Sequence, residues 1–318
     1  MERIAVIGAG LMGSGIAQVF AAGGWRVTLQ DVRPEALEPA LGALRRNLEF
    51  LEEHGLGPAD GVDAAVARID TTTELETAAE ADFVVECVFE DVALKQEVFR
   101  RLDGCCPPDT ILATNTSVIS ITEIASRSRR RGRILGTHFW NPPYLIPLVE
   151  VVRAADTEVA VMDSTIALLQ KAGKHPVRVE KDVPGFVANR LQHALWREAI
   201  SIVERGIADA ATVDECVRFG FGMRLPVLGP MENADMVGLD LTLAIHDYIL
   251  PHLEASPEPS PLLRGRVAAG DLGFKTGTGF QRWSPEAAAA SREHLLTYLT
   301  ELLARGAAHR HDDRHHDD

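Results

Sequence analysis

Apolar positions in the first 180 residues follow two alternating patterns. Short runs of valine, isoleucine and leucine are typical of buried parallel strands, and apolar residues spaced three or four apart between them indicate helices. The strand-like runs cover residues 3–7, 26–30, 82–87, 110–113, 133–136 and about 176–180. Strands and helices in this alternation predict an α/β fold with a doubly wound, Rossmann-type sheet.

A helical insertion is expected at about 34–70, after the second strand. Its apolar positions recur at helical spacing, at Leu41, Leu44, Leu48 and Leu51. Pro39 suggests that the regular helix begins there, and residues 64–66 suggest a second, shorter helix. The segment carries eight acidic residues and three arginines, a balance of −5.

Strand patterns end at the linker around Pro184. Helices are expected at about 157–172 before it and, after it, at 186–206, from a capping box at Thr212, and at 232–249, 262–269 and 285–303. We therefore expect a sheet domain at 1–182 and a smaller all-α domain at 183–306. The tail, 307–318, alternates in charge and has few apolar residues, which predicts disorder.

Composition excludes several classes of protein. A net charge of −14 argues against a general nucleic-acid binder. The four cysteines lack the spacing of metal ligands and, with no signal peptide, read as reduced thiols of a cytoplasmic protein. Glycines interrupt the apolar stretch at 4–24, so a strand, a turn and a helix explain it better than a membrane span. No metal site and no membrane association are expected.

A glycine motif follows the first strand directly. Gly8, Gly10 and Gly13 form G-x-G-x-x-G between a strand and a helix, the context in which this motif binds a dinucleotide. Asp31, at the end of the second strand, is placed to accept hydrogen bonds from the adenosine ribose and to repel a 2′-phosphate. NAD is therefore the expected cofactor, although Arg33 leaves some use of NADP open. Glycines kept only for a turn are the structural alternative.

Polar residues gather just after the later strands, where ligands of a doubly wound sheet bind. For Glu90 and Lys95 the alternative is a solvated ion pair, and for Ser117 it is a helix N-cap. An arginine cluster at 127–133 fits a solvated connection better than an anion patch.

His138 leaves one predicted strand and Glu150 enters the next, with a proline-rich turn between them. Adjacent strands joined tightly would bring the two side chains together. A neutral imidazole accepts a proton near pH 7, and a neighbouring carboxylate would orient it and stabilise its charged form. Taken alone, the pair also fits a structural histidine.

Together these motifs resemble the L-3-hydroxyacyl-CoA dehydrogenase family over nearly the whole chain. The matching residues are Gly8-x-Gly10-x-x-Gly13, Glu86 with Glu90 and Lys95, Asn115-Thr116-Ser117, His138-Phe139-x-Asn141-Pro142, Leu148-Val149-Glu150, Pro184-Gly185-Phe186 with Asn189, and Lys275-Thr276-Gly277. The resemblance implies an NAD-dependent oxidoreductase that interconverts a secondary L-3-hydroxyl and a 3-oxo group. It also implies a homodimer formed through the helical domain.

The resemblance gives the matched residues their expected roles. His138 is the general base, and Glu150 orients it and stabilises its charged form. Ser117 and Asn189 donate hydrogen bonds to the substrate oxygen. The contacts to the nicotinamide half of the cofactor are expected from Glu90, Lys95, Asn141 and Lys275.

Two departures leave the substrate open between a CoA thioester and a free hydroxy acid. The acidic segment at 34–70 is poorly suited to a polyanion such as CoA. The turn at 142–147 is similar to relatives that act on small free acids, the L-gulonate 3-dehydrogenase (lambda-crystallin) and carnitine dehydrogenase branch. The stretch at 270–277, in contrast, is similar to short-chain 3-hydroxybutyryl-CoA enzymes.

Two other classes share parts of this pattern. Lysine-based β-hydroxyacid dehydrogenases have the same glycine motif, but no lysine lies in the long helix at 186–203 where that class places its catalyst. A non-catalytic, crystallin-like NAD-binding protein would have no need of Ser117, His138, Glu150 and Asn189 together.

Overall fold

The computed structural model describes residues 1–312, with side chains through Arg305. Its centre is an eight-stranded sheet in the order β3-β2-β1-β4-β5-β6-β7-β8. The strands are β1 Arg3–Ile7, β2 Arg26–Gln30, β3 Ile69–Thr72, β4 Phe83–Glu86, β5 Ile111–Thr114, β6 Ile134–Phe139, β7 Leu148–Val152 and β8 His175–Val179. β1 to β6 are parallel, whereas β7 runs antiparallel to β6 and parallel to β8.

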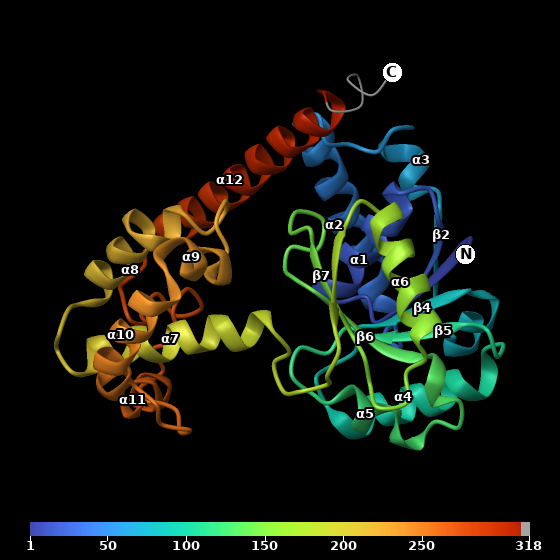
Figure 1. Ribbon diagram of the computed structural model, residues 1–318. Helices are drawn as coiled ribbons and strands as arrows, with labels where there is room; N and C mark the ends of the chain where they lie inside the picture. Colours follow the sequence, from blue (N-terminus) through green and yellow to red (C-terminus); the bar gives the residue numbers. More distant parts are fainter. Residues whose placement is uncertain (313–318) are drawn as a thin grey trace. The chain divides into compact units, whose positions relative to one another are not determined.

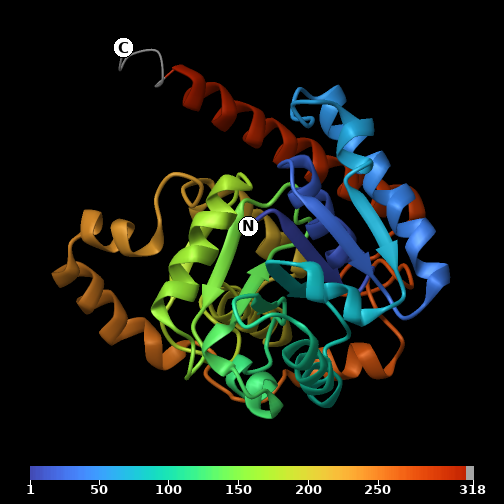
Figure 2. The ribbon, with the colours of Figure 1, turned by 90° about the vertical axis from the view of Figure 1, so that its right-hand side faces the viewer.

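Helices cover both faces of the sheet (Figure 1, Figure 2). Because side chains alternate along a strand, Ile4 and Val6 of β1 join one apolar core, while Ala5 and Ile7 join the other. The first core includes residues of α1 Leu11–Ala22, α2 Pro34–Glu53, α3 Val62–Val66 and α6 Val159–Lys171. The second includes residues of η1 Leu75–Glu80, α4 Val92–Cys105 and α5 Ile121–Ile124. The predicted doubly wound α/β sheet is confirmed.

The remaining α-helices make up the helical part of the chain. They are α7 Ala188–Glu204, α8 Ala210–Phe219, α9 Pro230–Val237, α10 Leu239–Ile249, α11 Pro261–Ala268 and α12 Pro285–Asp312. No residue of α8, α9, α10 or α11 is buried in the single chain. Among the described residues, no helix is both long enough and apolar enough to cross a membrane.

The chain divides into two compact units. The first unit contains Met1–Asn189 together with the C-terminal stretch from Leu295, and the second unit is Arg190–His294. The first unit thus extends beyond the boundary expected after residue 182. The reason is that Phe186 packs into the second core and the Val187 amide donates a hydrogen bond to Glu150.

Two boundaries near the insertion differ from the sequence prediction. The helical insertion was expected to continue to about residue 70, but β3 begins at Ile69. It is an edge strand with only Ile69 buried, so it lacks the apolar run that reveals a central strand. Helix α2 begins at Pro34, not at Pro39. A proline at the first helical position is favourable, and Pro39, on the exposed side, removes only one helical hydrogen bond.

Three further boundaries differ in the helical part. α8 is capped by Asp209, whose Oδ1 accepts a hydrogen bond of 2.8 Å from the Thr212 amide, so the capping box placed at Thr212 is wrong. The helix expected at 232–249 is two helices, because Gly238 has a φ of 100° and interrupts it. α12 runs to Asp312 and so includes the first six residues of the predicted tail, while 313–318 lie outside the described residues.

Candidate active site

At two positions of the turn after β1, packing within the protein itself requires glycine. Gly8 has a φ of 102°, and a Cβ there would lie 2.8 Å from the carbonyl oxygen of Cys87. A Cβ at Gly13 would lie 1.8 Å from the carbonyl oxygen of Gly8. At Gly10, by contrast, a Cβ would meet nothing within 4 Å. The open side of Gly10 therefore leaves room for a ligand's phosphate at the start of α1.

Asp31 follows β2 and faces this turn. Its Oδ2 accepts a hydrogen bond of 2.9 Å from the Ala9 amide, and its Oδ1 accepts one of 3.0 Å from the Arg33 amide. Burial acts to raise the pKa of Asp31, but these amides and the Arg33 guanidinium outweigh it and lower the pKa below its ordinary value. Asp31 is therefore an ionised acceptor beside the glycine turn. The Arg33 guanidinium also lies over the ring of Phe89, 5.9 Å from its centroid.

A buried charge network lies beneath the ends of β4 and β5. Lys95 is only 1% exposed, and its Nζ lies 2.8 Å from Glu86 Oε1 and 3.4 Å from Glu90 Oε2. Glu90 Oε1 in turn accepts hydrogen bonds from the Thr116 hydroxyl and the Ser117 amide, at 2.5 and 3.0 Å. The solvated ion pair considered for Glu90 and Lys95 is thus wrong. The buried Lys95 thus contacts Glu90, which is exposed.

Glu86 is the member of this network to which the sequence gave no role. It is fully buried, and its Oε2 accepts a hydrogen bond of 2.8 Å from the Thr114 hydroxyl. Burial raises the pKa of Glu86 in spite of the opposing effect of Lys95. A glutamate that ends an otherwise apolar strand needs a buried partner. Its position in the sequence was therefore the signal that could have indicated a buried ion pair.

His138 and Glu150 face each other across the β6–β7 hairpin. The register pairs the two residues directly, and His138 Nδ1 lies 2.8 Å from Glu150 Oε2. Both are buried, with His138 5% exposed and Glu150 0%. Because Nδ1 donates to the carboxylate, Nε2 is left as the proton acceptor. The predicted pairing of these two residues is confirmed by the geometry.

The other carboxylate oxygen of Glu150 is held by the linker. It accepts hydrogen bonds of 2.9 and 3.0 Å from the amides of Val187 and Ala188. Burial acts to raise the pKa of Glu150, but the hydrogen bonds from His138 and these two amides lower it below its ordinary value. The amides point at the carboxylate because Gly185 and Phe186 both have positive φ, 76° and 49°. A bulky residue in that region is strained, which is typical of functional sites.

The remaining predicted residues of the first unit lie around this hairpin. Asn189 Nδ2 donates a hydrogen bond of 3.1 Å to the Ser117 carbonyl oxygen, which connects the start of α7 to the turn after β5. Ser117 does not cap α5; Ser120 does. Asn141 is exposed and lies three residues after His138, beyond the end of β6. Lys275 lies in the second unit, exposed between the bridged residues Gly273 and Thr278, and its assignment rests on the sequence motif alone.

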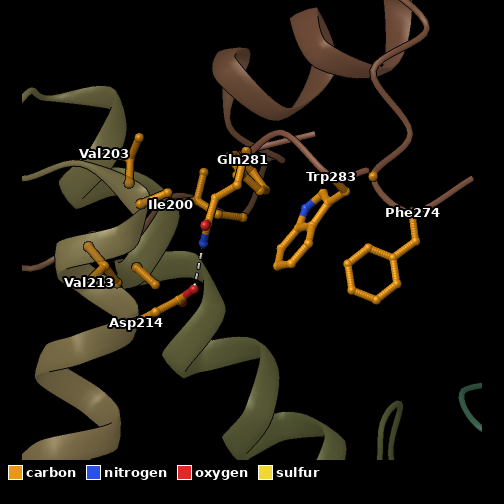
Figure 3. Close-up of a pocket in the computed structure, with 11 residues that line it drawn as sticks. Ile200, Val203, Val213, Asp214, Phe274, Gln281 and Trp283 are labelled. Carbon is orange, nitrogen blue, oxygen red and sulfur yellow. Dashed lines mark hydrogen bonds between the residues drawn. The ribbon is translucent and has the colours of Figure 1, made fainter. Parts of the chain in front are cut away.

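A separate pocket of about 330 Å3 lies within the second unit, Arg190–His294, called the helical unit below. It lies between α7, α8 and the segment 273–283 (Figure 3). Ile200, Val213, Phe274 and Trp283 make most of its wall apolar. Its one carboxylate, on Asp214, accepts a hydrogen bond of 2.7 Å from Gln281 Nε2. The pocket therefore has no acid–base pair.

Comparisons with known proteins agree with this geometry. Residues 3–183 match the family model described as 3-hydroxyacyl-CoA dehydrogenase, NAD binding domain, and residues 185–283 match the C-terminal domain of the same description. A Bacillus subtilis protein named probable 3-hydroxybutyryl-CoA dehydrogenase is 43% identical over 281 residues, 88% of this chain and 96% of its own. A Mesorhizobium japonicum protein named 5-formyl-3-hydroxy-2-methylpyridine 4-carboxylate 5-dehydrogenase is 36% identical over 307 residues, 95% of this chain and 98% of its own. A solved structure of a 5-dehydrogenase for the same pyridine acid, described as an NAD+ dependent dismutase, has a TM-score of 0.88 at 34% identity and covers 95% of this chain and 97% of its own.

Proposed function

Because the chain belongs to the 3-hydroxyacyl-CoA dehydrogenase family of NAD-dependent oxidoreductases, we propose that it oxidises a secondary L-3-hydroxyl to a 3-oxo group, and catalyses the reverse. The observation that carries the proposal is the buried His138–Glu150 pair at the carboxyl end of β6. Hydride transfer needs from the protein an aligned substrate and one well-placed base, and the pair supplies that base.

NAD supplies the hydride acceptor, and the residues around the glycine turn fit it. Gly10 leaves space for the phosphates, and the ionised Asp31 offers acceptors to the adenosine ribose. His138 takes the hydroxyl proton on Nε2, while Glu150 holds Nδ1 and stabilises the imidazolium that forms. Ser117 and the second N–H of the Asn189 amide donate to the substrate oxygen, and Glu90 and Asn141 hold the nicotinamide end. Lys95 acts there through Glu90.

A second candidate is the same chemistry on a small free hydroxy acid. The acidic segment at 34–70 favours it: all eight of its carboxylates are exposed, whereas Arg45 pairs with Asp63 and Arg68 with Asp60. Two of its three arginines are thus already engaged, so the segment offers little to the phosphates of CoA. The Mesorhizobium relative, named for a pyridine carboxylate, is aligned over 95% of this chain.

Substrate choice is tested by NADH formation with L-3-hydroxybutyryl-CoA, L-gulonate, L-carnitine and free 3-hydroxybutyrate. From the acidic segment we expect kcat/KM for the CoA thioester to exceed that for the best free acid by less than about 100-fold, or about 2.8 kcal/mol. A larger preference contradicts the free-acid candidate. No NADH formation across a broad panel, in spite of tight NAD binding, contradicts the enzyme and favours a binding-only protein.

Cofactor choice is expected to depend on Asp31 and Arg33. Asp31→Ser removes the charged acceptor and frees the Arg33 guanidinium, which lies 3.4 Å from Asp31. We expect kcat/KM with NAD to fall about 10- to 100-fold, the scale of lost charged hydrogen bonds, and kcat/KM with NADP to rise. The double variant Asp31→Ser/Arg33→Ala should lose the gain with NADP. An unchanged NAD/NADP ratio in Asp31→Ser would remove Asp31 from cofactor selection.

We also propose a homodimer formed through the helical unit. The helices α8 to α11 bury no residue in the single chain, and apolar side chains are exposed all along α10, at Leu239, Leu241, Leu243, Ile245 and Tyr248. A unit of this size cannot be stable without a core, and an obligate homodimer interface resembles a core cut in half. The apolar pocket of Figure 3 belongs to the same unit. We therefore propose that a second copy of this chain covers these exposed apolar side chains.

A further inference from the structure

The connection between β6 and β7, residues 140–147, is held by a lysine from elsewhere in the chain. Lys174 lies in the turn between α6 and β8, and its Nζ donates hydrogen bonds to the carbonyl oxygens of Pro143 and Ile146, at 2.5 and 2.7 Å. Among the ion pairs of the described residues, none involves Lys174. The partners of this ammonium are therefore two backbone carbonyl groups of the connection.

The connection is fixed on its other side by the helix that follows the glycine turn. The Pro143 ring lies against Gly15 of α1, where a Cβ would be 3.0 Å from Pro143 Cδ. Within the connection, the Pro142 carbonyl oxygen accepts the amides of Leu145 and Ile146 at 3.0 and 2.9 Å. The segment is thus a folded turn held between α1 and Lys174.

This turn lies between the two halves of the acid–base pair. It begins just after His138 and Phe139, carries Asn141, and ends three residues before Glu150. A shift of the turn along α1 moves Asn141 and the end of β6 relative to the phosphate-binding helix. Because reacting groups displaced by about 1 Å can lose about 100-fold in rate, the anchor of the turn matters for chemistry as well as for folding.

We propose that Lys174 is a positioning residue, whose ammonium holds the 140–147 turn so that Asn141 and His138 are correctly placed against the nicotinamide end of the bound cofactor. The inference rests on the proposed dehydrogenase function. Burial lowers the pKa of Lys174 to about 8, as expected for an ammonium without a carboxylate partner. The two charge-assisted hydrogen bonds offset that unfavourable environment.

Lys174→Met tests this role, because it keeps most of the length of the side chain and removes its charge and its donors. We expect kcat at saturating NAD and substrate to fall by about 10- to 100-fold. Binding of ADP-ribose, which lacks the nicotinamide, should stay within about twofold of wild type, since the glycine turn and Asp31 are untouched. Lys174→Arg, which keeps charge and donors, should recover most of kcat. Lys171→Met, an exposed lysine at the end of α6, is the matched control and should equal wild type.

The outcomes separate this inference from the proposed function. If wild type forms no NADH with any substrate, the dehydrogenase proposal fails, whatever Lys174 does. If wild type is active and Lys174→Met has the same kcat, or loses kcat and ADP-ribose binding in equal measure, the positioning role is overturned. Where Lys174→Met does not fold, Gly15→Ala displaces the turn from its other side, because the added methyl group meets Pro143. That variant should show the same fall in kcat, and an unchanged kcat in it overturns the inference.

Discussion

His138→Gln is expected to lower kcat by about two to four orders of magnitude while NAD still binds, the usual scale for loss of an acid–base group. Glutamine can keep a hydrogen bond to Glu150, but it cannot accept a proton near pH 7. The glycine turn and Asp31 are untouched, so the dissociation constant of NAD should stay close to that of wild type. The measurements are steady-state kinetics at saturating substrate and a direct titration with NAD.

Glu150→Gln gives a companion measurement for the same pair. The amide keeps the size of the side chain and can still accept from Val187 and Ala188, but it no longer stabilises an imidazolium by charge. A fall in kcat comparable to that of His138→Gln is expected, because the amide NH2 then donates to His138 Nδ1 and places the imidazole proton on Nε2, where the substrate proton must be accepted. A kcat of His138→Gln that is essentially unchanged would remove His138 from the mechanism.

The sheet was predictable because its strands are buried on both faces. Such strands read as continuous apolar runs, as in Phe83-Val84-Val85, and the helices between them have regular apolar spacing. β3 escaped prediction because only Ile69 of its four residues is buried. The break between α9 and α10 escaped it because a single glycine inside a helical pattern is often tolerated.

The parts of the site that could be predicted are those set by strand order and by short motifs. His138 and Glu150 meet because a hairpin pairs them, and a proline-rich turn between two strands already indicated one. Burial of Lys95 was hidden, because its partner Glu86 lies nine residues away and belongs to another element. Lys174 was hidden for a different reason: it binds backbone carbonyl oxygens, which exist at every residue and leave no pattern in a sequence.

Leu243→Asp is expected to dissociate the proposed dimer and to lower its thermal stability. Leu243 lies in the middle of α10 and is 62% exposed in the single chain. Apolar neighbours on both sides of that helix are also exposed. Covering a leucine stabilises an interface by about 1.5–3 kcal/mol, and a two-fold dimer loses that contact twice. The dissociation constant should therefore rise by at least about 100-fold, since each tenfold corresponds to about 1.4 kcal/mol. The unpaired aspartate adds to the loss.

Sedimentation over a range of protein concentrations and a thermal melt measure both effects. Val159→Asp is the matched control, because Val159 is also exposed and apolar but lies on α6 of the first unit, and its variant should stay dimeric. Wild-type protein that is monomeric at micromolar concentration contradicts the dimer outright. Since the first unit has an apolar core on each face of its sheet, NAD binding should survive dissociation. Loss of assembly with NAD binding retained would therefore show that the helical unit, and not the sheet, depends on the second copy.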